Sequence, residues 1–298
     1  MKVRIGYGPG IGQSNSDGSW YADFVDSLED LGFDSLWLPE RLGGPSSDPL
    51  IALAVAAGRT KRLKLGTSVL VLPGRNPVVL AKEMASLDAL SGGRFLAAVG
   101  LGVADPLEQS AFGVERTERA AMFDESLDLM RKLWSGQVVD HDGEHFHLHG
   151  LRLVLRPAQP VLEVWLGGVA PSELRRVGRL ADGWLPSFIT PEDAAAGRKV
   201  VEEVAKESGR SIDQEHFGAL VTYTLDGIPD RFRTFLENRK PGIDPESLVA
   251  TGTSGIRGLL ERFVDQGFSK FVLAPVSAAP ITRADLELIA KEVLPLQN

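Results

Sequence analysis

This 298-residue chain has two glycine-rich segments that follow apolar runs, and the first could hold a phosphate group. The first, Gly167-Gly168-Val169, follows an apolar run and precedes Pro171, a residue type favoured in the first turn of a helix. Glycine leaves the backbone accessible, and the free N–H groups at a helix N-terminus attract anions. The same glycines are also compatible with a tight strand-to-helix turn that binds nothing.

The second segment, Gly100-Leu101-Gly102-Val103, also comes directly after an apolar run. It begins like the GxGxxG fingerprint of dinucleotide-binding folds, but Asp105 stands where the third glycine belongs. The segment also follows the fourth predicted strand, whereas that fingerprint follows the first strand of its fold. We therefore reject a Rossmann fold and expect a glycine turn at a binding site.

Two side chains are candidates for proton transfer. Glu40 follows the second predicted strand, and its carboxylate could take or give a proton or accept a hydrogen bond from a cofactor edge. Tyr7 ends the first predicted strand and is the other candidate. The alternative for Glu40 is an ion pair or a solvated loop charge.

The histidine and cysteine residues of the chain limit the kinds of metal site and cysteine chemistry that it could have. Four histidines crowd one short segment, at positions 141, 145, 147 and 149. They lie on a predicted hairpin without an acidic partner fixed beside them, so we expect an exposed polar face and no metal site. The chain has no cysteine, which excludes disulfides, thiolate catalysis and iron–sulfur clusters.

Eight apolar segments are typical of strands, and amphipathic segments lie between them. The strands are expected at Val3–Tyr7, Asp34–Leu38, Leu63–Leu70, Phe95–Gly100, Leu162–Leu166, Gly183–Pro186, Phe217–Leu225 and Lys270–Ala274. This alternation predicts an α/β fold, a (β/α)8 TIM barrel, with its chemistry at the carboxyl ends of the strands. Those ends are poor in charge and rich in glycine and apolar residues, which suits a flat ring system.

The bulk composition fits a single barrel domain over residues 1–298, because 43% of the residues are hydrophobic and no linker-like segment interrupts them. Two insertions are expected. Residues 137–150 alternate around Asp142-Gly143 and predict a β-hairpin. Residues 226–252 follow the seventh strand, contain a helical stretch and could cover the barrel mouth.

A net charge of −8 disfavours nucleic acid or an anionic membrane as partner, so the expected partner is a small-molecule substrate. No signal-peptide pattern opens the chain and no apolar run approaches the roughly 20 residues of a membrane span, so we expect a cytoplasmic protein. Lys64 and Lys270 stand at strand starts, the wrong end for the lysine of a Schiff-base aldolase.

Three segments carry a family resemblance. They are GFDSLWLPE (32–40), LGTSVLVLPGRNPVVLAKEMASLDALSGGRFLAAVGLG (65–102) and VWLGGVAPSELRRVGRLADGWLPS (164–187). Together they resemble the luciferase-like monooxygenase superfamily, and within it the actinobacterial oxidoreductases that use the deazaflavin coenzyme F420. The resemblance implies a barrel that binds a flavin or deazaflavin at its mouth, often as a homodimer.

The resemblance also implies a cis peptide bond between Ser68 and Val69, in a bulge that supports the ring system from behind. Residues expected to contact the cofactor are Glu40, Thr67, Ser68, Val69, Gly100, Leu101, Gly102, Val103, Gly167, Gly168 and Val169. Of these, Leu101 to Val103 would meet the cofactor tail and Gly167-Gly168 its phosphate. Related deazaflavin dehydrogenases have Asp-His where this chain has Glu40 and Arg41, so a histidine-assisted mechanism does not transfer directly.

The main hypothesis is an oxidoreductase that uses coenzyme F420 to transfer a hydride to or from a small organic substrate, with Glu40 or Tyr7 handling the proton. The substrate-phosphate lysines of the sugar-phosphate branch find no match, which argues against that substrate. One alternative is an FMN-dependent monooxygenase with the same fold. Another is a barrel that binds flavin without catalysis.

Overall fold

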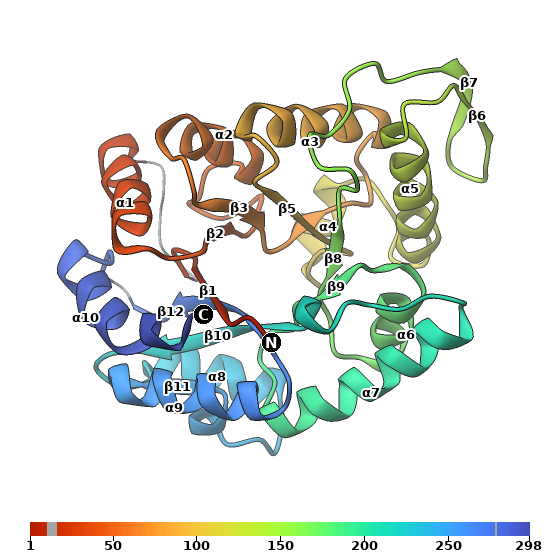
Figure 1. Cartoon of the computed structure of the whole chain (residues 1–298). Helices are drawn as coiled ribbons and strands as arrows, with labels where there is room; N and C mark the ends of the chain where they lie inside the picture. The colour runs from red at the N-terminus through yellow and green to blue at the C-terminus, as the bar shows by residue number, and fades with distance from the viewer. Residues whose placement is uncertain (11–16, 278) are drawn as a thin grey trace.

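The computed structural model describes residues 1–10, 17–277 and 279–298. Its parallel sheet curls into a ring that is surrounded by helices (Figure 1). In the described part of the chain the ring contains eight strands: β1 (Arg4–Tyr7), β2 (Ser35–Leu38), β3 (Lys64–Thr67), β5 (Phe95–Gly100), β8 (Val164–Leu166), β9 (Gly183–Trp184), β10 (Gly218–Thr224) and β12 (Lys270–Pro275). Parallel bridges from Trp184 to Phe217 and from Ser187 to Leu220 connect β9, and the residues that follow it, to β10 and so close the ring. The predicted TIM barrel is confirmed.

The third predicted strand is not continuous over Leu63–Leu70. Its first part is β3, and after a break at Ser68 and Val69 the chain continues as β4 (Leu70–Val71). Both parts pair in parallel with β5, with Leu70 opposite Val99 and Val71 opposite Gly100. The break therefore lies at the carboxyl end of the sheet, between two segments that are held on the same neighbouring strand.

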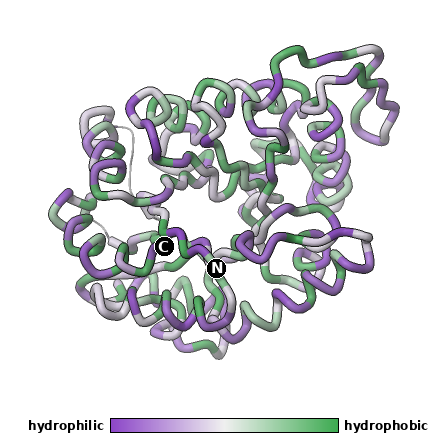
Figure 2. The backbone as a smooth tube through the Cα atoms, viewed as in Figure 1, coloured by the Kyte–Doolittle hydropathy of each residue, from purple (hydrophilic) through white to green (hydrophobic). Residues whose placement is uncertain are grey.

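Helices follow most of the strands, and six of the described α-helices begin at a residue whose side chain caps them. The outer helices are α1 (Gly18–Leu31), α2 (Pro49–Arg59), α3 (Pro77–Ser91), α5 (Arg119–Trp134), α6 (Pro171–Leu180), α7 (Pro191–Glu207), α9 (Gly252–Asp265) and α10 (Arg283–Val293), and a short α4 (Pro106–Ala111) precedes α5. At α3, Asn76 accepts hydrogen bonds from the backbone N–H groups of Val78 and Val79, as its position before Pro77 predicts. The outer helices alternate between hydrophilic and hydrophobic residues in Figure 2, as expected for helices with one face on the sheet.

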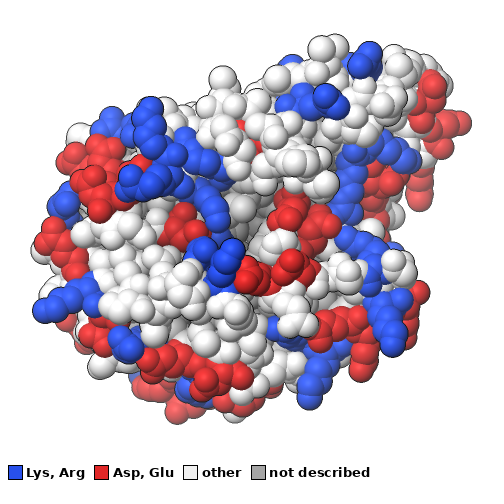
Figure 3. All heavy atoms as spheres, in the orientation of Figure 1, with Lys and Arg blue, Asp and Glu red and all other residues white. Residues whose placement is uncertain are grey.

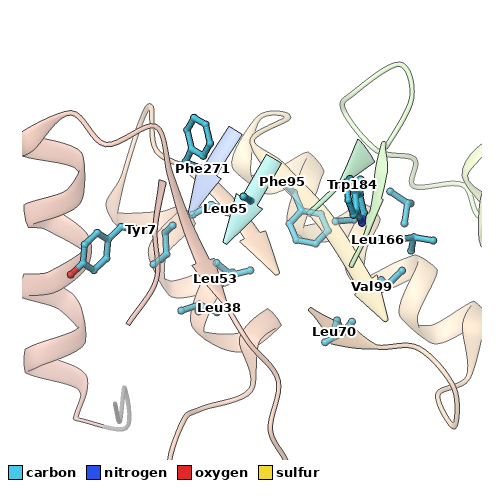
Figure 4. Packing of buried hydrophobic residues seen from close by; sticks show 14 of the residues in the cluster. Tyr7, Leu38, Leu53, Leu65, Leu70, Phe95, Val99, Leu166, Trp184 and Phe271 are labelled. Carbon is cyan, nitrogen blue, oxygen red and sulfur yellow. The ribbon is translucent and has the colours of Figure 1, made fainter. Parts of the chain in front are cut away.

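Buried side chains form two layers on the two faces of the sheet. The larger layer lies between the sheet and the helices and contains the residues drawn in Figure 4, such as Leu65, Phe95 and Phe271. The smaller layer fills the inside of the ring and contains Trp37, Ala98, Trp165, Leu185 and Val272. Alternate residues of one strand enter different layers, because successive side chains of a strand point to opposite faces.

Glycines make room for the two tryptophans inside the ring. A Cβ atom on Gly66 would lie 2.8 Å from Cζ3 of Trp37, and one on Gly183 would lie 2.5 Å from Cε2 of Trp165. Neither distance is possible without displacing an indole ring, and Trp37 is fully buried. The sequence places glycine on β3 and β9 because the neighbouring strands send large rings into the same space.

The 226–252 insertion contains α8 (Asp230–Arg239), a 3-10 turn (Pro245–Ser247) and β11 (Val249–Thr251). The helix was predicted, whereas β11 was not; it pairs in parallel with the carboxyl half of β10. The insertion packs through a small hydrophobic cluster of its own, which consists of Phe188, Phe232, Leu236, Leu248, Val249 and Val276. Since Phe188 and Val276 follow β9 and β12, α8 lies at the carboxyl end of the ring, as predicted.

The 137–150 insertion forms the predicted antiparallel hairpin from β6 (Val139–Asp142) and β7 (His147–Leu151). It projects from the ring of helices beyond α5 (Figure 1). Among the described residues, none of the helices is both long and apolar enough to cross a membrane. On the face shown in Figure 3, acidic and basic side chains are intermingled.

We predict that Gly66→Ala lowers the free energy of unfolding by about 1–3 kcal/mol, because its methyl group would overpack the indole of Trp37. Equilibrium unfolding in urea measures this loss. The control is Gly258→Ala in α9, where an added Cβ meets no atom within 4 Å. Alanine there should raise the free energy of unfolding by up to about 1 kcal/mol. Equal effects of the two substitutions would show that the ring repacks freely.

Candidate functional site

The break between β3 and β4 is the centre of the candidate site. The Ser68–Val69 peptide bond is cis, as the family resemblance implies. The segment is held on both neighbouring strands: the backbone N–H of Ser68 donates to the carbonyl of Leu38 at 2.8 Å, and the Thr67 hydroxyl donates to the carbonyl of Ala98 at 2.7 Å. The Ala98 N–H donates back to the same hydroxyl oxygen. Thr67 therefore has a structural hydrogen-bonding role.

The Val69 side chain lies against the two glycine segments that follow the adjacent strands β5 and β8. A Cβ on Gly100 would lie 2.7 Å from Cγ2 of Val69, and a Cβ on Gly167 would lie 3.9 Å from its Cγ1. Val69 itself is half-buried. Three of the segments that were predicted to contact a cofactor are thus adjacent, and glycine at position 100 is required by the closeness of Val69.

Glu40 is buried, with 7% of its surface exposed, and both of its carboxylate oxygens are bound. Oε2 accepts a hydrogen bond from the Val71 N–H at 2.7 Å, and Oε1 forms an ion pair with the Arg75 guanidinium. Burial raises the pKa of Glu40, although Val71 and Arg75 act in the opposite direction. Both oxygens are therefore engaged by groups of the chain itself, as the ion-pair alternative for Glu40 expects.

Tyr7 was predicted to take part in proton transfer, but the structure places its side chain away from the mouth of the barrel. Its side chain is fully buried between the sheet and the helices, where it packs against Phe24 and Phe33. Figure 4 shows its ring directed toward the neighbouring helix. Its hydroxyl group is hydrogen-bonded to that of Tyr223, and burial raises the pKa of Tyr7 well above its usual value. The sequence identifies the strand end, but a shift of one residue decides which face the side chain joins.

The glycine turn before α6 differs from the predicted phosphate site. Gly168 has φ of +92°, and its carbonyl accepts a hydrogen bond from the Trp184 indole. The next two backbone N–H groups, of Val169 and Ala170, both donate to the carboxylate of Glu173 at 2.8 Å. These donors are therefore occupied, and a negative charge lies where a phosphate was expected. The structure favours the tight-turn alternative for this segment.

Arg119, at the start of α5, is a buried cation beside the glycine turn at Gly102 that the sequence analysis did not identify. It is 4% exposed, and its Nε has no hydrogen-bond partner among the described residues. Its Nη2 lies 3.6 Å from the position that a Cβ on Gly102 would occupy. Burial, together with the nearby charge of Arg116, lowers the pKa of Arg119. An anion at Gly102 would satisfy this guanidinium. The segment 115–119 contains four charged residues, and nothing in the sequence marks which one is buried.

The rim of the mouth beside this position is formed by half-buried or exposed residues. Leu101 and Val103 are not fully buried, and Arg41 forms an ion pair with Glu108 of α4 at 2.8 Å. On the other side of the ring, Thr222 is buried on the inward face of β10, and its hydroxyl has no partner in the described segments of the chain. Thr222 is a further polar group that the sequence did not identify.

The remaining candidates lie away from the mouth. His141 is hydrogen-bonded to Glu125, and His147 to Asp142. Within the residues that the structure describes, no group of three or more histidine, aspartate or glutamate side chains could hold a metal ion. Lys64 and Lys270 both form ion pairs with Asp34 at the amino ends of their strands, at 3.3 and 2.5 Å.

A closed parallel ring with glycine turns and a bulge at the carboxyl ends of its strands defines a TIM-barrel protein. The chain belongs to the luciferase-like monooxygenase family, whose model matches residues 8–232. An F420-dependent glucose-6-phosphate dehydrogenase of Nakamurella multipartita is 33% identical over 253 residues, which cover 80% of this chain and 71% of that protein. The Kineococcus radiotolerans protein of the same name is 35% identical over 55% of this chain, and the match spans about half of that relative's length.

Solved structures confirm the fold across nearly the whole chain. An F420-dependent secondary alcohol dehydrogenase, in complex with an F420-acetone adduct, has a TM-score of 0.82 at 20% identity, with full coverage of both chains. The FMN-bound oxygenating component of 3,6-diketocamphane monooxygenase from Pseudomonas putida has a TM-score of 0.77 at 19% identity, with 99% coverage of both chains. At these identities the likeness concerns the fold alone. The relatives named above carry the link to coenzyme F420.

We predict that Arg119→Met leaves the free energy of unfolding of the ligand-free protein unchanged or raises it, because methionine replaces a buried guanidinium nitrogen that lacks a partner. Urea unfolding measures the change. The matched control is Arg176→Met, since Arg176 is also mostly buried but is paired with Asp124 at 2.8 Å. That substitution should lower stability. If Arg119→Met is the more damaging of the two, Arg119 already has its partner within the chain.

Proposed function

We propose that this protein is an oxidoreductase that binds coenzyme F420 at the carboxyl end of the barrel and transfers a hydride to or from a small organic substrate. The observation that carries the proposal is that Val69 meets Gly100 and Gly167, while Arg119, whose Nε has no partner in the described part of the chain, lies against Gly102. Such a mouth offers a flat apolar wall, open backbone and one positive charge for a phosphorylated side arm. Relatives at 33% and 35% identity are F420-dependent dehydrogenases, which supports the choice of cofactor.

The roles of the residues follow from their positions. Val69 would support the back of the ring system, and Gly100 and Gly167 would leave the space in front of it open. Arg119, and not the α6 N-terminus, would bind the phosphate, because Glu173 already occupies the N–H groups of Val169 and Ala170. When bound, F420 supplies two-electron hydride chemistry, so the protein need only orient and desolvate the reactants.

The substrate would enter on the opposite side of the mouth, beneath α8. Phe188 and Val276 anchor the insertion on the rim, which would keep water from the reacting atoms. Thr222 would offer a hydroxyl for hydrogen bonding on that side. Glu40 and Tyr7 have no proton-transfer role in this proposal, because the Glu40 carboxylate is bound on both oxygens and Tyr7 faces the helices.

The second candidate is an FMN-dependent monooxygenase, which the FMN-bound Pseudomonas enzyme of the same fold supports. It uses the same wall and the same positive charge, so the residues described so far fit either cofactor. The third candidate is a barrel that binds the cofactor without turnover. Binding and reoxidation experiments separate the three.

We predict that the purified protein binds F420 with micromolar or tighter affinity and binds FMN more weakly, as measured by fluorescence titration. Arg119→Met should weaken F420 binding by about 10- to 100-fold, which corresponds to the loss of one charge-assisted hydrogen-bonding group. For the dephosphorylated chromophore, the same variant should have the same affinity as the unmodified protein. Micromolar FMN binding without F420 binding would favour the monooxygenase, and binding without substrate-dependent reoxidation would favour the non-catalytic barrel.

We also propose that the protein is a homodimer that associates through α2. Ile51 and Val55 lie one helical turn apart on this helix and are 67% and 50% exposed. Val79, on the adjacent α3, is 55% exposed. Two neighbouring helices thus present aliphatic side chains that the core of this chain does not use.

Ile51→Glu is predicted to shift the protein from dimer to monomer, because a carboxylate would be buried in the interface. Light scattering coupled to size-exclusion chromatography measures the mass. Leu288→Glu serves as the control, since Leu288 is equally an exposed aliphatic residue, 59% exposed, but lies on α10. A dimer that survives at Ile51 but dissociates at Leu288 would place the interface elsewhere.

A further inference from the structure

We propose that the ion pair between Glu40 and Arg75 is a positioning device that fixes the depth of Val69, so that binding of the cofactor ring depends on two residues that do not touch it. This inference rests on the proposed function, because it concerns the same mouth. It replaces the expectation that Glu40 contacts the cofactor or its proton. Arg75 was not a candidate in the sequence reasoning.

The pair holds the residues on the carboxyl side of the cis bond through their backbone. The Glu40 N–H donates to the carbonyl of Val69 at 3.3 Å, and its carboxylate accepts from the N–H of Val71 at 2.7 Å. Arg75 completes the loop, because its Nε donates to the carbonyl of Val71 at 3.0 Å. Both backbone groups of Val71 and the carbonyl of Val69 are therefore fixed by the same two side chains and one backbone amide.

The position of Val69 is sensitive to this attachment. A hypothetical Cβ on Gly100 would lie only 2.7 Å from Cγ2 of Val69. The valine side chain therefore has little freedom on that side. Leu70, next along the chain, is fully buried and paired with Val99. A small movement of Val69 and Val71 would move the wall into or away from the ring, and ligand contacts are lost over shifts of about 1 Å.

Burial explains why the pair acts as a unit. The Glu40 side chain is 4% exposed and that of Arg75 is 24% exposed. Removing one partner leaves a poorly solvated charge, which the surrounding segment would relieve by rearranging. Arg75 also lies 4.0 Å from Asp48, whose other oxygen caps α2. The device thus connects the bulge with the loop after β2 and with the start of a helix.

A purely structural role predicts a different result. In that case, loss of the pair lowers the free energy of unfolding, while the folded protein binds the ring as before. The positioning role predicts that the folded variant binds the ring more weakly and that its bound chromophore has a shifted absorption band. The loss should be the same with and without the phosphate on the ligand, since the pair acts on the ring and Arg119 on the phosphate.

The test measures dissociation constants of F420 and of its dephosphorylated chromophore for the unmodified protein and for the variants Arg75→Met, Arg75→Lys, Arg119→Met and Arg176→Met. Urea unfolding first establishes that each variant is folded at the temperature of the binding experiment. We expect Arg75→Met to weaken both ligands by about 10-fold or more. Lysine can still pair with Glu40 but lacks the several donor groups of a guanidinium. The dissociation constants of Arg75→Lys should therefore lie between those of the unmodified protein and those of Arg75→Met. If Arg75→Met does not fold, Arg75→Lys carries the test.

The controls separate the possible failures. Arg176→Met removes a mostly buried ion pair remote from the bulge and should lower stability without changing either dissociation constant. If the Arg75 variants behave like Arg176→Met, the positioning proposal is overturned while the proposed function stands. If the unmodified protein binds neither F420 nor its chromophore, the proposed function fails and the positioning role fails with it.

Discussion

Two indole rings determine how this barrel is built. Trp37 and Trp165 lie inside the ring of strands, where Gly66 and Gly183 leave space that no larger residue could share. These rings fill the interior at their level, and in barrels of this kind the active site lies beyond such a core, at the carboxyl edge. The bulge at Val69 and the glycine turns lie at that edge. The side chains packed inside the ring thus lie directly below the candidate site.

Much of this architecture follows from local patterns in the sequence. The strands of the ring are close to where apolar runs and helix caps place them, since a parallel strand buried on both faces leaves a strong signal and Asn76-Pro77 fixes a helix start. The break between β3 and β4 and the extra strand β11 could not be found in this way. The first lies inside a largely apolar segment that is typical of one continuous strand, and the second is three residues long and pairs only with β10 among the described strands.

The site was predicted less well, and the misses have a common physical origin. The resemblance to a known family located the bulge and the glycine segments. The orientation of Tyr7, the occupation of the α6 N-terminus by Glu173 and the burial of Arg119 all depend on which neighbour each side chain meets in space. A single sequence indicates the types of the charged residues along the chain, but their pairing is decided by tertiary contacts between segments that lie far apart.

The insertion over the mouth has a hydrophobic cluster that is separate from the main layers of the barrel. Phe232 and Leu236 of α8 meet the ring through Phe188 and Val276, whereas Val249 also pairs with Thr222 of β10. Substitutions in this cap can therefore accumulate with little cost to the folding of the scaffold below it. During evolution the cap could change, and with it the preferred substrate, while the residues proposed to bind the cofactor stay the same. Such modular divergence is one physical route by which a single barrel comes to serve many different reactions.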